Sequence, residues 1–155
     1  MISRHPSTRH KTGFSLLELL VVLCIGAMLT LLATSGYAAV LRRATRHEVR
    51  LALWRLAAAQ ENHRLQFGQY AIRIAVPPMG TASVETMVAP PLPSGWSFAF
   101  QSVSDTGWMV VAIATDGTKA PARDSDCLEW RLDQTGAASA RASDGRDTSA
   151  TCWRR

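Results

Sequence analysis

A single carboxylate stands at the edge of the longest apolar run in the chain. The segment from Leu19 to Leu41 contains no charged residue. As a helix it would extend roughly 35 Å at about 1.5 Å per residue, which is long enough to span a bilayer. Glu18 directly precedes this run. A carboxylate at the centre of a membrane costs about 2.5–3.5 kcal/mol, and less near an end. The sequence therefore predicts that a cation compensates Glu18.

The residues before this glutamate form a specific combination. A short basic leader is followed by the Gly13–Phe14 junction, and Glu18 stands four residues after the phenylalanine. This combination resembles the class III signal of type IV pilins and pseudopilins. The resemblance implies that prepilin peptidase cleaves after Gly13 and that Phe14 becomes an N-methylated N-terminus. Glycine suits such a junction because it has no Cβ, so its backbone can approach a protease closely.

The same resemblance gives Glu18 a role. It would be the fifth residue of the mature chain, and in pilins this glutamate pairs with the N-terminal amine of a neighbouring subunit. The physical argument agrees, because a buried carboxylate needs a cation and an amine at the same depth supplies one. The alternative is an interfacial glutamate in an ordinary signal anchor.

Two other interpretations of the apolar run remain. A secretory signal peptide would have an apolar core of about 7–15 residues before a small-x-small cleavage site. Gly36-Tyr37-Ala38 could serve as that site, but the run is too long and Glu18 is unexplained. An unprocessed anchor is the second alternative. Basic residues flank both ends of the run and leave its orientation open, whereas the resemblance places the leader in the cytoplasm.

The chain departs from the major-pilin pattern near Ser35. Major pilins usually carry a helix-breaking proline there, and this chain has Ser35-Gly36 instead. The difference favours a minor pilin or a pseudopilin.

Charge divides the chain into segments. The whole chain has a formal net charge of +5, and removal of the basic leader, residues 1–13, lowers it. We expect a membrane or filament-core helix at 14–41, an amphipathic half of the same helix at 42–67, and a head at 68–155. The amphipathic half is rich in arginine, whereas acidic and basic residues nearly balance in the head. This distribution argues against a nucleic-acid-binding head, because phosphate binding needs clustered positive charge.

The amphipathic half shows helical periodicity. Apolar residues and one histidine recur at three- and four-residue spacing and predict one buried face: Val49, Ala52, Leu53, Leu56, Ala59, His63, Phe67 and Tyr70. His63 is interpreted as a partly buried helix residue. Gly68 is expected to end the helix.

The head is predicted to be a small antiparallel sheet within residues 95–135. Alternating or apolar runs at Trp96–Val103, Trp108–Thr115 and Cys127–Asp133 predict at least three strands, the second of them central. Residues 68–94, rich in proline, are expected to form a long connection with one short strand or turn near Ser83–Val88. One long helix and an antiparallel sheet make an α+β fold.

The cysteines favour an extracytoplasmic head. Cys24 lies in the apolar run, and Cys127 and Cys152 remain as a pair bounding a C-terminal loop, residues 127–152. A disulfide there would stabilise a small domain by about 3 kcal/mol; two reduced buried thiols are the alternative. The strand after Cys127, the following Gln-x-Gly and the terminal Cys-Trp are similar to the end of PilE-type minor pilins. The Leu56–Tyr70 stretch is similar to theirs too.

Enzymatic motifs are weak in this sequence. The histidines at positions 5, 10, 47 and 63 form no metal-ligand spacing, and no Cys-x-x-Cys or glycine-rich phosphate loop occurs. Asp124, Asp126 and Glu129 are interpreted as a solvated turn beside a strand rather than a cation site. We therefore expect neither catalysis nor a metal or other cofactor.

These patterns together predict a PilE-type minor pilin of a type IV pilus that contributes to assembly and to motility or adhesion. Its partners would be prepilin peptidase and other pilin subunits. Its location would be the bacterial inner membrane, with a periplasmic head, and then the pilus. One alternative is a pseudopilin of type II secretion. Another, less favoured, is a DNA receptor that uses arginines near Trp153: Arg141, Arg146, Arg154 and Arg155.

Overall fold

A computed structural model describes residues 15–76, 81–115 and 124–154, without the side chains of residues 31–35. One helix, α1 (Leu16–Phe67), begins the described chain. The chain up to Tyr37 and the chain from Ala38 onward are separate compact units.

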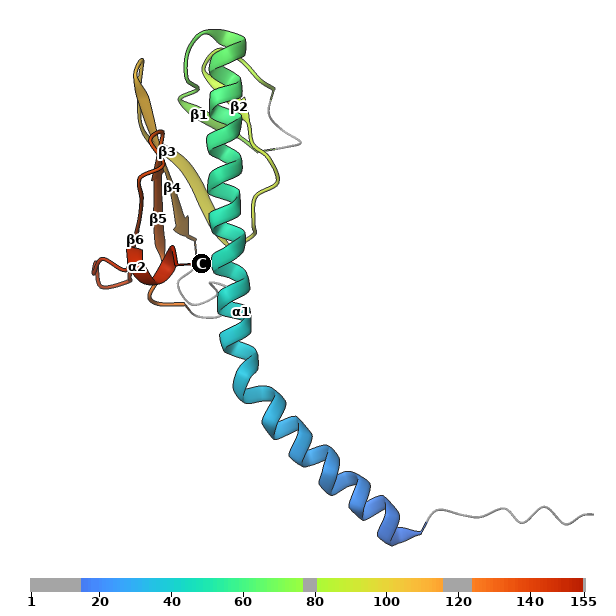
Figure 1. The fold of residues 1–155 in the computed structure, drawn as a ribbon. Coiled ribbons are helices and arrows are strands. Elements are labelled where there is room, and N and C mark those ends of the chain that lie inside the picture. Colours follow the sequence, from blue (N-terminus) through green and yellow to red (C-terminus); the bar gives the residue numbers. More distant parts are fainter. Residues whose placement is uncertain (1–14, 77–80, 116–123, 155) are drawn as a thin grey trace, which may run out of the picture. The chain divides into compact units, whose positions relative to one another are not determined.

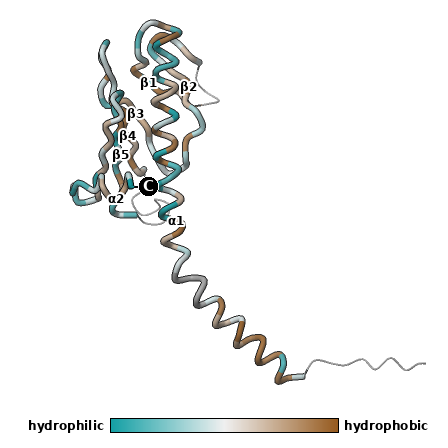
Figure 2. Tube along the Cα trace, viewed as in Figure 1, coloured by the Kyte–Doolittle hydropathy of each residue, from teal (hydrophilic) through white to brown (hydrophobic). Residues whose placement is uncertain are grey.

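The described residues of the first unit form the beginning of α1. Figure 2 shows that its residues are mainly hydrophobic. Their large apolar side chains are exposed, from 45% at Val21 to 88% at Leu16. Within the described residues, no helix has the combination of length and hydropathy required of a membrane span.

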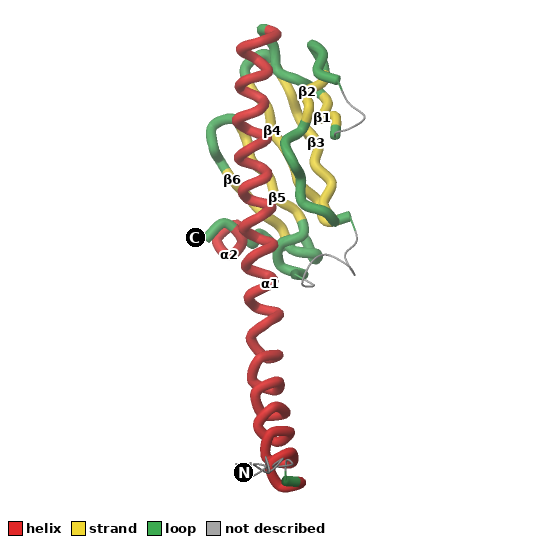
Figure 3. Tube along the Cα trace, turned by 90° about the vertical axis from the view of Figure 1, so that its right-hand side faces the viewer, coloured by secondary structure: helices red, strands yellow, loops and turns green. Residues whose placement is uncertain are grey.

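The second unit combines the later part of α1 with an antiparallel sheet (Figures 1 and 3). Its sheet has the order β3-β4-β5-β6. The strands are β3 (Trp96–Ser104), β4 (Gly107–Ala114), β5 (Glu129–Asp133) and β6 (Ala138–Arg141). A second sheet pairs β1 (Arg73–Ala75) and β2 (Thr86–Val88) in parallel, and α2 (Ser149–Cys152) follows β6. The predicted α+β architecture is confirmed, with β4 as an internal strand.

The core lies between α1 and one face of the four-stranded sheet. Val49, Leu53 and Leu56 of α1 are fully buried. On the sheet, Ala112 of β4 pairs with Trp130 of β5, which pairs with Ala140 of β6, and all three are buried. Burying one large aliphatic side chain contributes about 1.5–3 kcal/mol, so this contact fixes the helix on the sheet.

Strand β3 contains a register shift that simple alternation does not predict. Trp96, Phe98 and Phe100 are half-buried on the core side, as expected from their spacing. The register then shifts between Phe100 and Ser102, and Val103 also packs against the core. An extra residue in one strand reverses the alternation beyond it, which explains why Val103 faces inward.

The connection after α1 is more ordered than the sequence indicated. Gly68 adopts a positive φ of 77°, which suits glycine at a helix C-terminus. Strand β2 and the bridge between Ser83 and Thr86 lie in the predicted short-strand region, but the strand β1 was not predicted. Tyr70 and Met87 are buried. These two residues pack in the core, so these parts of the connection are not solvated.

A buried glutamine attaches this connection to α1. Gln60 is fully buried; its Nε2 donates to the carbonyl oxygen of Ala71 at 2.8 Å, and its Oε1 accepts from the Ala71 N–H at 3.3 Å. The helical pattern of apolar residues did not include Gln60, since a polar residue carries no hydrophobic signal.

Replacing Gln60 with methionine should lower the free energy of unfolding by about 1–3 kcal/mol. The side chain keeps its size, but two buried backbone groups of Ala71 lose their partners. Urea unfolding of the full chain in detergent, followed by tryptophan fluorescence, measures the change. Gln66→Met is the matched control because Gln66 is exposed on the same helix. Equal stability of the two variants would contradict the role of the amide.

Candidate functional site: the start of α1 and the arginine face of the head

The first turn of α1 carries Glu18. The Leu19 N–H donates to the carbonyl oxygen of Ser15 at 3.2 Å, so Glu18 lies within the first hydrogen-bonded turn. Glu18 is exposed, and a carboxylate is favoured in a first turn by the helix dipole. Gly13 and Phe14, the predicted cleavage and methylation residues, lie outside the described residues.

The surface around Glu18 is apolar on every side. Exposed side chains point in all directions from this part of α1: Leu16, Leu17, Leu19, Leu20, Val21, Val22, Leu23, Ile25, Met28 and Leu29. A helix that is apolar all round is covered in its working state by lipid or by other helices. In either environment the carboxylate of Glu18 would need a cation from outside this segment.

In the second unit, a disulfide joins Cys127 and Cys152 across 25 residues of sequence. Both cysteines are buried. The Trp130 N–H donates to the Cys127 carbonyl oxygen at 2.9 Å, and Trp130 meets Trp153 edge to face with ring centroids 5.4 Å apart. The disulfide and the tryptophan pair therefore hold the C-terminal segment on the sheet.

Two arginines of α1 bind parts of the head that follow far later in the sequence. Arg46 donates to both carboxylate oxygens of Asp124, at 2.6 and 2.9 Å. The hydrogen bond with Asp124 raises the pKa of Arg46, although burial alone would lower it. Arg50 donates from Nη1 to the carbonyl oxygens of Trp153 and Arg154, at 3.2 and 2.7 Å.

The burial of Asp124 contradicts its interpretation as part of a solvated turn. Only 6% of the surface of Asp124 is exposed. The sequence could not reveal the partner, because 78 residues separate Arg46 from Asp124. Within the described residues, no group of three His, Cys, Asp or Glu side chains could hold a metal ion.

Asp124→Asn should lower the free energy of unfolding by about 1.5–3 kcal/mol, because hydrogen bonds to charged groups contribute about that much. Urea unfolding measures the loss. Asp144→Asn is the control: Asp144 contacts Arg146 at 2.6 Å, but both side chains are more than half exposed, so little change is expected. A smaller effect at Asp124 than at Asp144 would contradict the importance of the buried pair.

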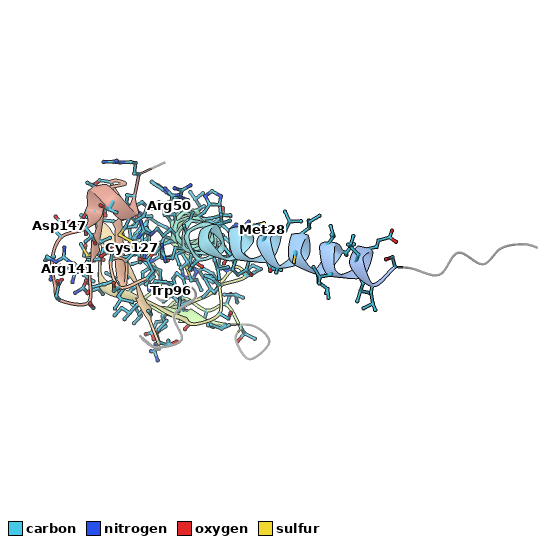
Figure 4. All side chains as sticks on the ribbon, turned by 90° about the horizontal axis from the view of Figure 1, so that it is seen from below. Met28, Arg50, Trp96, Cys127, Arg141 and Asp147 are labelled. Carbon is cyan, nitrogen blue, oxygen red and sulfur yellow. A yellow bond between two sulfur atoms is a disulfide. The ribbon has the colours of Figure 1, made fainter. Side chains whose placement is uncertain are left out.

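Among the described residues, the arginines considered for DNA binding do not form one patch, because Arg154 lies beside Arg50, which donates to its carbonyl oxygen. Arg146 is paired with Asp144, and this contact lowers the pKa of Asp144. Figure 4 shows Arg141 and Asp147 well away from Arg50. Trp153 is partly buried, and its N–H donates to the carbonyl oxygen of Ser139 at 2.9 Å. Arg155 lies outside the described residues.

Comparison with known protein families gives a match at the start of the chain. The family model described as the prokaryotic N-terminal methylation motif matches residues 8–34. Among curated proteins, none matches the chain significantly. The motif and the α+β fold together support a pilin-like or pseudopilin-type structural protein. Such a motif implies membrane anchoring, processing by prepilin peptidase and assembly with other pilins.

Proposed function

We propose that the chain is a minor pilin of the PilE type, assembled into a type IV pilus through its N-terminal helix. The observation that carries this proposal is the methylation motif over residues 8–34, which continues into an exposed apolar helix with Glu18 in its first turn. Cleavage after Gly13 and methylation of Phe14 would create an amine one helical turn before Glu18. In the filament, Glu18 pairs with the N-terminal amine of a neighbouring subunit.

The proposed function includes a location and partners. The chain is anchored in the bacterial inner membrane with its head in the periplasm, and it then enters the pilus with other pilin subunits. In this proposal the chain has four functional segments: the leader (1–13), the core helix (14–41), the helix half that packs on the sheet (42–67) and the displayed head (68–155). Neither a cofactor nor a catalytic residue takes part in this function.

A pseudopilin of type II secretion is the second candidate. Ser35-Gly36 in place of the proline of major pilins suits this candidate as well as it suits a minor pilin. Shearing of surface filaments separates the two candidates. Recovery of the mature chain in sheared filaments supports the pilus, whereas retention in the membrane with loss of protein secretion on deletion supports the pseudopilin.

Mass spectrometry of the mature N-terminus from the bacterial membrane fraction tests the proposal first. The expected chain begins at methylated Phe14. A chain beginning at Met1 would instead be an unprocessed anchor, and one beginning near Ala39 would be a secreted domain. Either result would overturn the pilin proposal.

Gly13→Val should block removal of the leader, because a β-branched side chain at the junction prevents the backbone from entering a protease cleft closely. The precursor should accumulate at least about tenfold over the mature chain, a factor that needs about 1.4 kcal/mol. Immunoblotting of the membrane fraction measures the ratio. Gly26→Val is the control, since a Cβ at Gly26 meets nothing within 4 Å. Normal processing of the Gly13 variant would argue against prepilin peptidase.

A further inference from the structure

The later part of α1 and the C-terminal segment together form a groove lined by four arginines. The groove has a volume of about 470 Å³, and its lining includes Arg43, Arg46, Arg50, Arg154 and Thr151. The three helix arginines follow one another at spacings of three and four residues, which places them on one face of α1. The fourth arginine comes from the segment that the disulfide holds at Cys152.

Positive charge in this groove is only partly neutralised. Arg46 is bound to Asp124, and it also lies 4.0 Å from Asp126. Among the described residues, no salt bridge occurs at Arg43, Arg50 or Arg154. In the part of the chain that the structure describes, the two aspartates offset two of the four arginines, so these side chains leave an excess of positive charge. A groove of this kind attracts an anion.

Arg50 is the last of the three helix arginines in the groove and is held in place. Its Nη1 donates to the carbonyl oxygens of Trp153 and Arg154, so the backbone that carries Arg154 is fixed beside α1. Its Nε is buried and has no hydrogen-bond partner among the described residues. A buried N–H without an acceptor is uncommon in native proteins, so Arg50 has donor capacity that the fold itself does not use.

We propose that this groove binds the phosphate group of an acidic phospholipid. Guanidinium groups match phosphate oxygens in charge and in planar hydrogen-bond geometry, and the Thr151 hydroxyl adds a further donor. The lipid assignment follows from position, because Arg43 stands two residues after Leu41, the end of the apolar run. A negatively charged membrane surface attracts nearby basic residues, as is known at the cytoplasmic leaflet, and anionic headgroups at the periplasmic surface would attract them by the same charge. This step rests on the membrane anchoring of the proposed function.

Native mass spectrometry of the full chain tests the proposal. The protein is released from nonionic detergent micelles that contain equal amounts of phosphatidylglycerol and phosphatidylcholine, and the bound lipids are counted. We expect about tenfold more phosphatidylglycerol than phosphatidylcholine on the wild type. Arg43→Gln combined with Arg154→Gln should bring the ratio close to one, because a tenfold preference corresponds to only about 1.4 kcal/mol, no more than the loss of a hydrogen bond to a charged group removes.

A matched control removes the same charge elsewhere. Arg55→Gln combined with Arg141→Gln changes two exposed arginines outside the groove, and this variant should keep the preference for phosphatidylglycerol. An equal loss in both double variants would show a general charge effect and overturn the proposal. Arg43 and Arg154 are also exposed, so we expect the double variant to fold. Unchanged urea unfolding confirms this, and the single Arg43→Gln variant replaces the double variant if the double variant unfolds.

Competition identifies the source of the phosphate. Inorganic phosphate that displaces the lipid at equal concentration would assign the groove to free phosphate, and a short single-stranded oligonucleotide that displaces it would assign nucleic acid. Both results overturn the lipid proposal. The lipid count does not depend on cleavage after Gly13. A retained lipid preference on a chain that is never processed would therefore refute the pilin function alone, and a processed chain without the preference would refute the lipid site alone.

Discussion

Cys127→Ser is expected to lower the free energy of unfolding of the head by about 3 kcal/mol, because the disulfide closes a loop of 25 residues. The loss would be large for a small domain, whose total stability is about 5–15 kcal/mol. The new hydroxyl would also occupy a buried position, since Cys127 is only 1% exposed. Urea unfolding of the full chain in detergent, with and without a reductant, measures both effects.

Two further variants separate these effects. Cys127→Ala combined with Cys152→Ala removes the disulfide without adding a hydroxyl, so any additional loss in Cys127→Ser reports the buried polar group. Cys24→Ser is the matched control, because Cys24 is free and exposed. Insensitivity of the wild type to the reductant, together with unchanged stability of the double variant, would contradict a stabilising disulfide.

The strands that the sequence predicted are those with strong side-chain patterns. The alternation at Trp130 and Leu132 is preserved, with both residues fully buried. Strand β6 was missed because Ala138–Arg141 reads Ala-Ser-Ala-Arg, which contains neither β-branched nor aromatic residues. Its pairing with β5 is a tertiary effect. Strands β1 and β2 contain only three residues each, too few to show a period.

Besides these short strands, the sequence did not reveal the polar contacts between residues that lie far apart in sequence. The acceptors of Arg50 lie more than 100 residues later in sequence, and no local pattern marks Arg50 as different from Arg55. The start of α1 is the opposite case. There the signal is local, since a glycine, a phenylalanine and a glutamate stand at fixed spacing, and the family model matches the same region. The family match therefore agrees with the local motif, whereas contacts between residues far apart in sequence leave no such local signal.

The largest functional effect is expected from Glu18→Val. Processing should be normal, because Glu18 lies outside the cleavage junction, but recovery of the chain in filaments should fall roughly 100-fold or more. Removing one partner of a buried ion pair leaves the other charge uncompensated, which costs about 3–5 kcal/mol. In this case the uncompensated group would be the amine at Phe14 of a neighbouring subunit. Quantitative immunoblotting of sheared filaments against the membrane fraction measures the ratio.

The control for this prediction is Glu48→Val, because Glu48 is an exposed glutamate later in the same helix, and its filament recovery should remain near that of the wild type. Glu18→Gln separates charge from hydrogen bonding, since the amide oxygen can still accept from the amine but carries no negative charge. If charge compensation is the reason for Glu18, the glutamine variant should fall between the wild type and the valine variant. Full recovery of Glu18→Val would remove the proposed pairing, and loss of processing in that variant would instead place Glu18 in peptidase recognition.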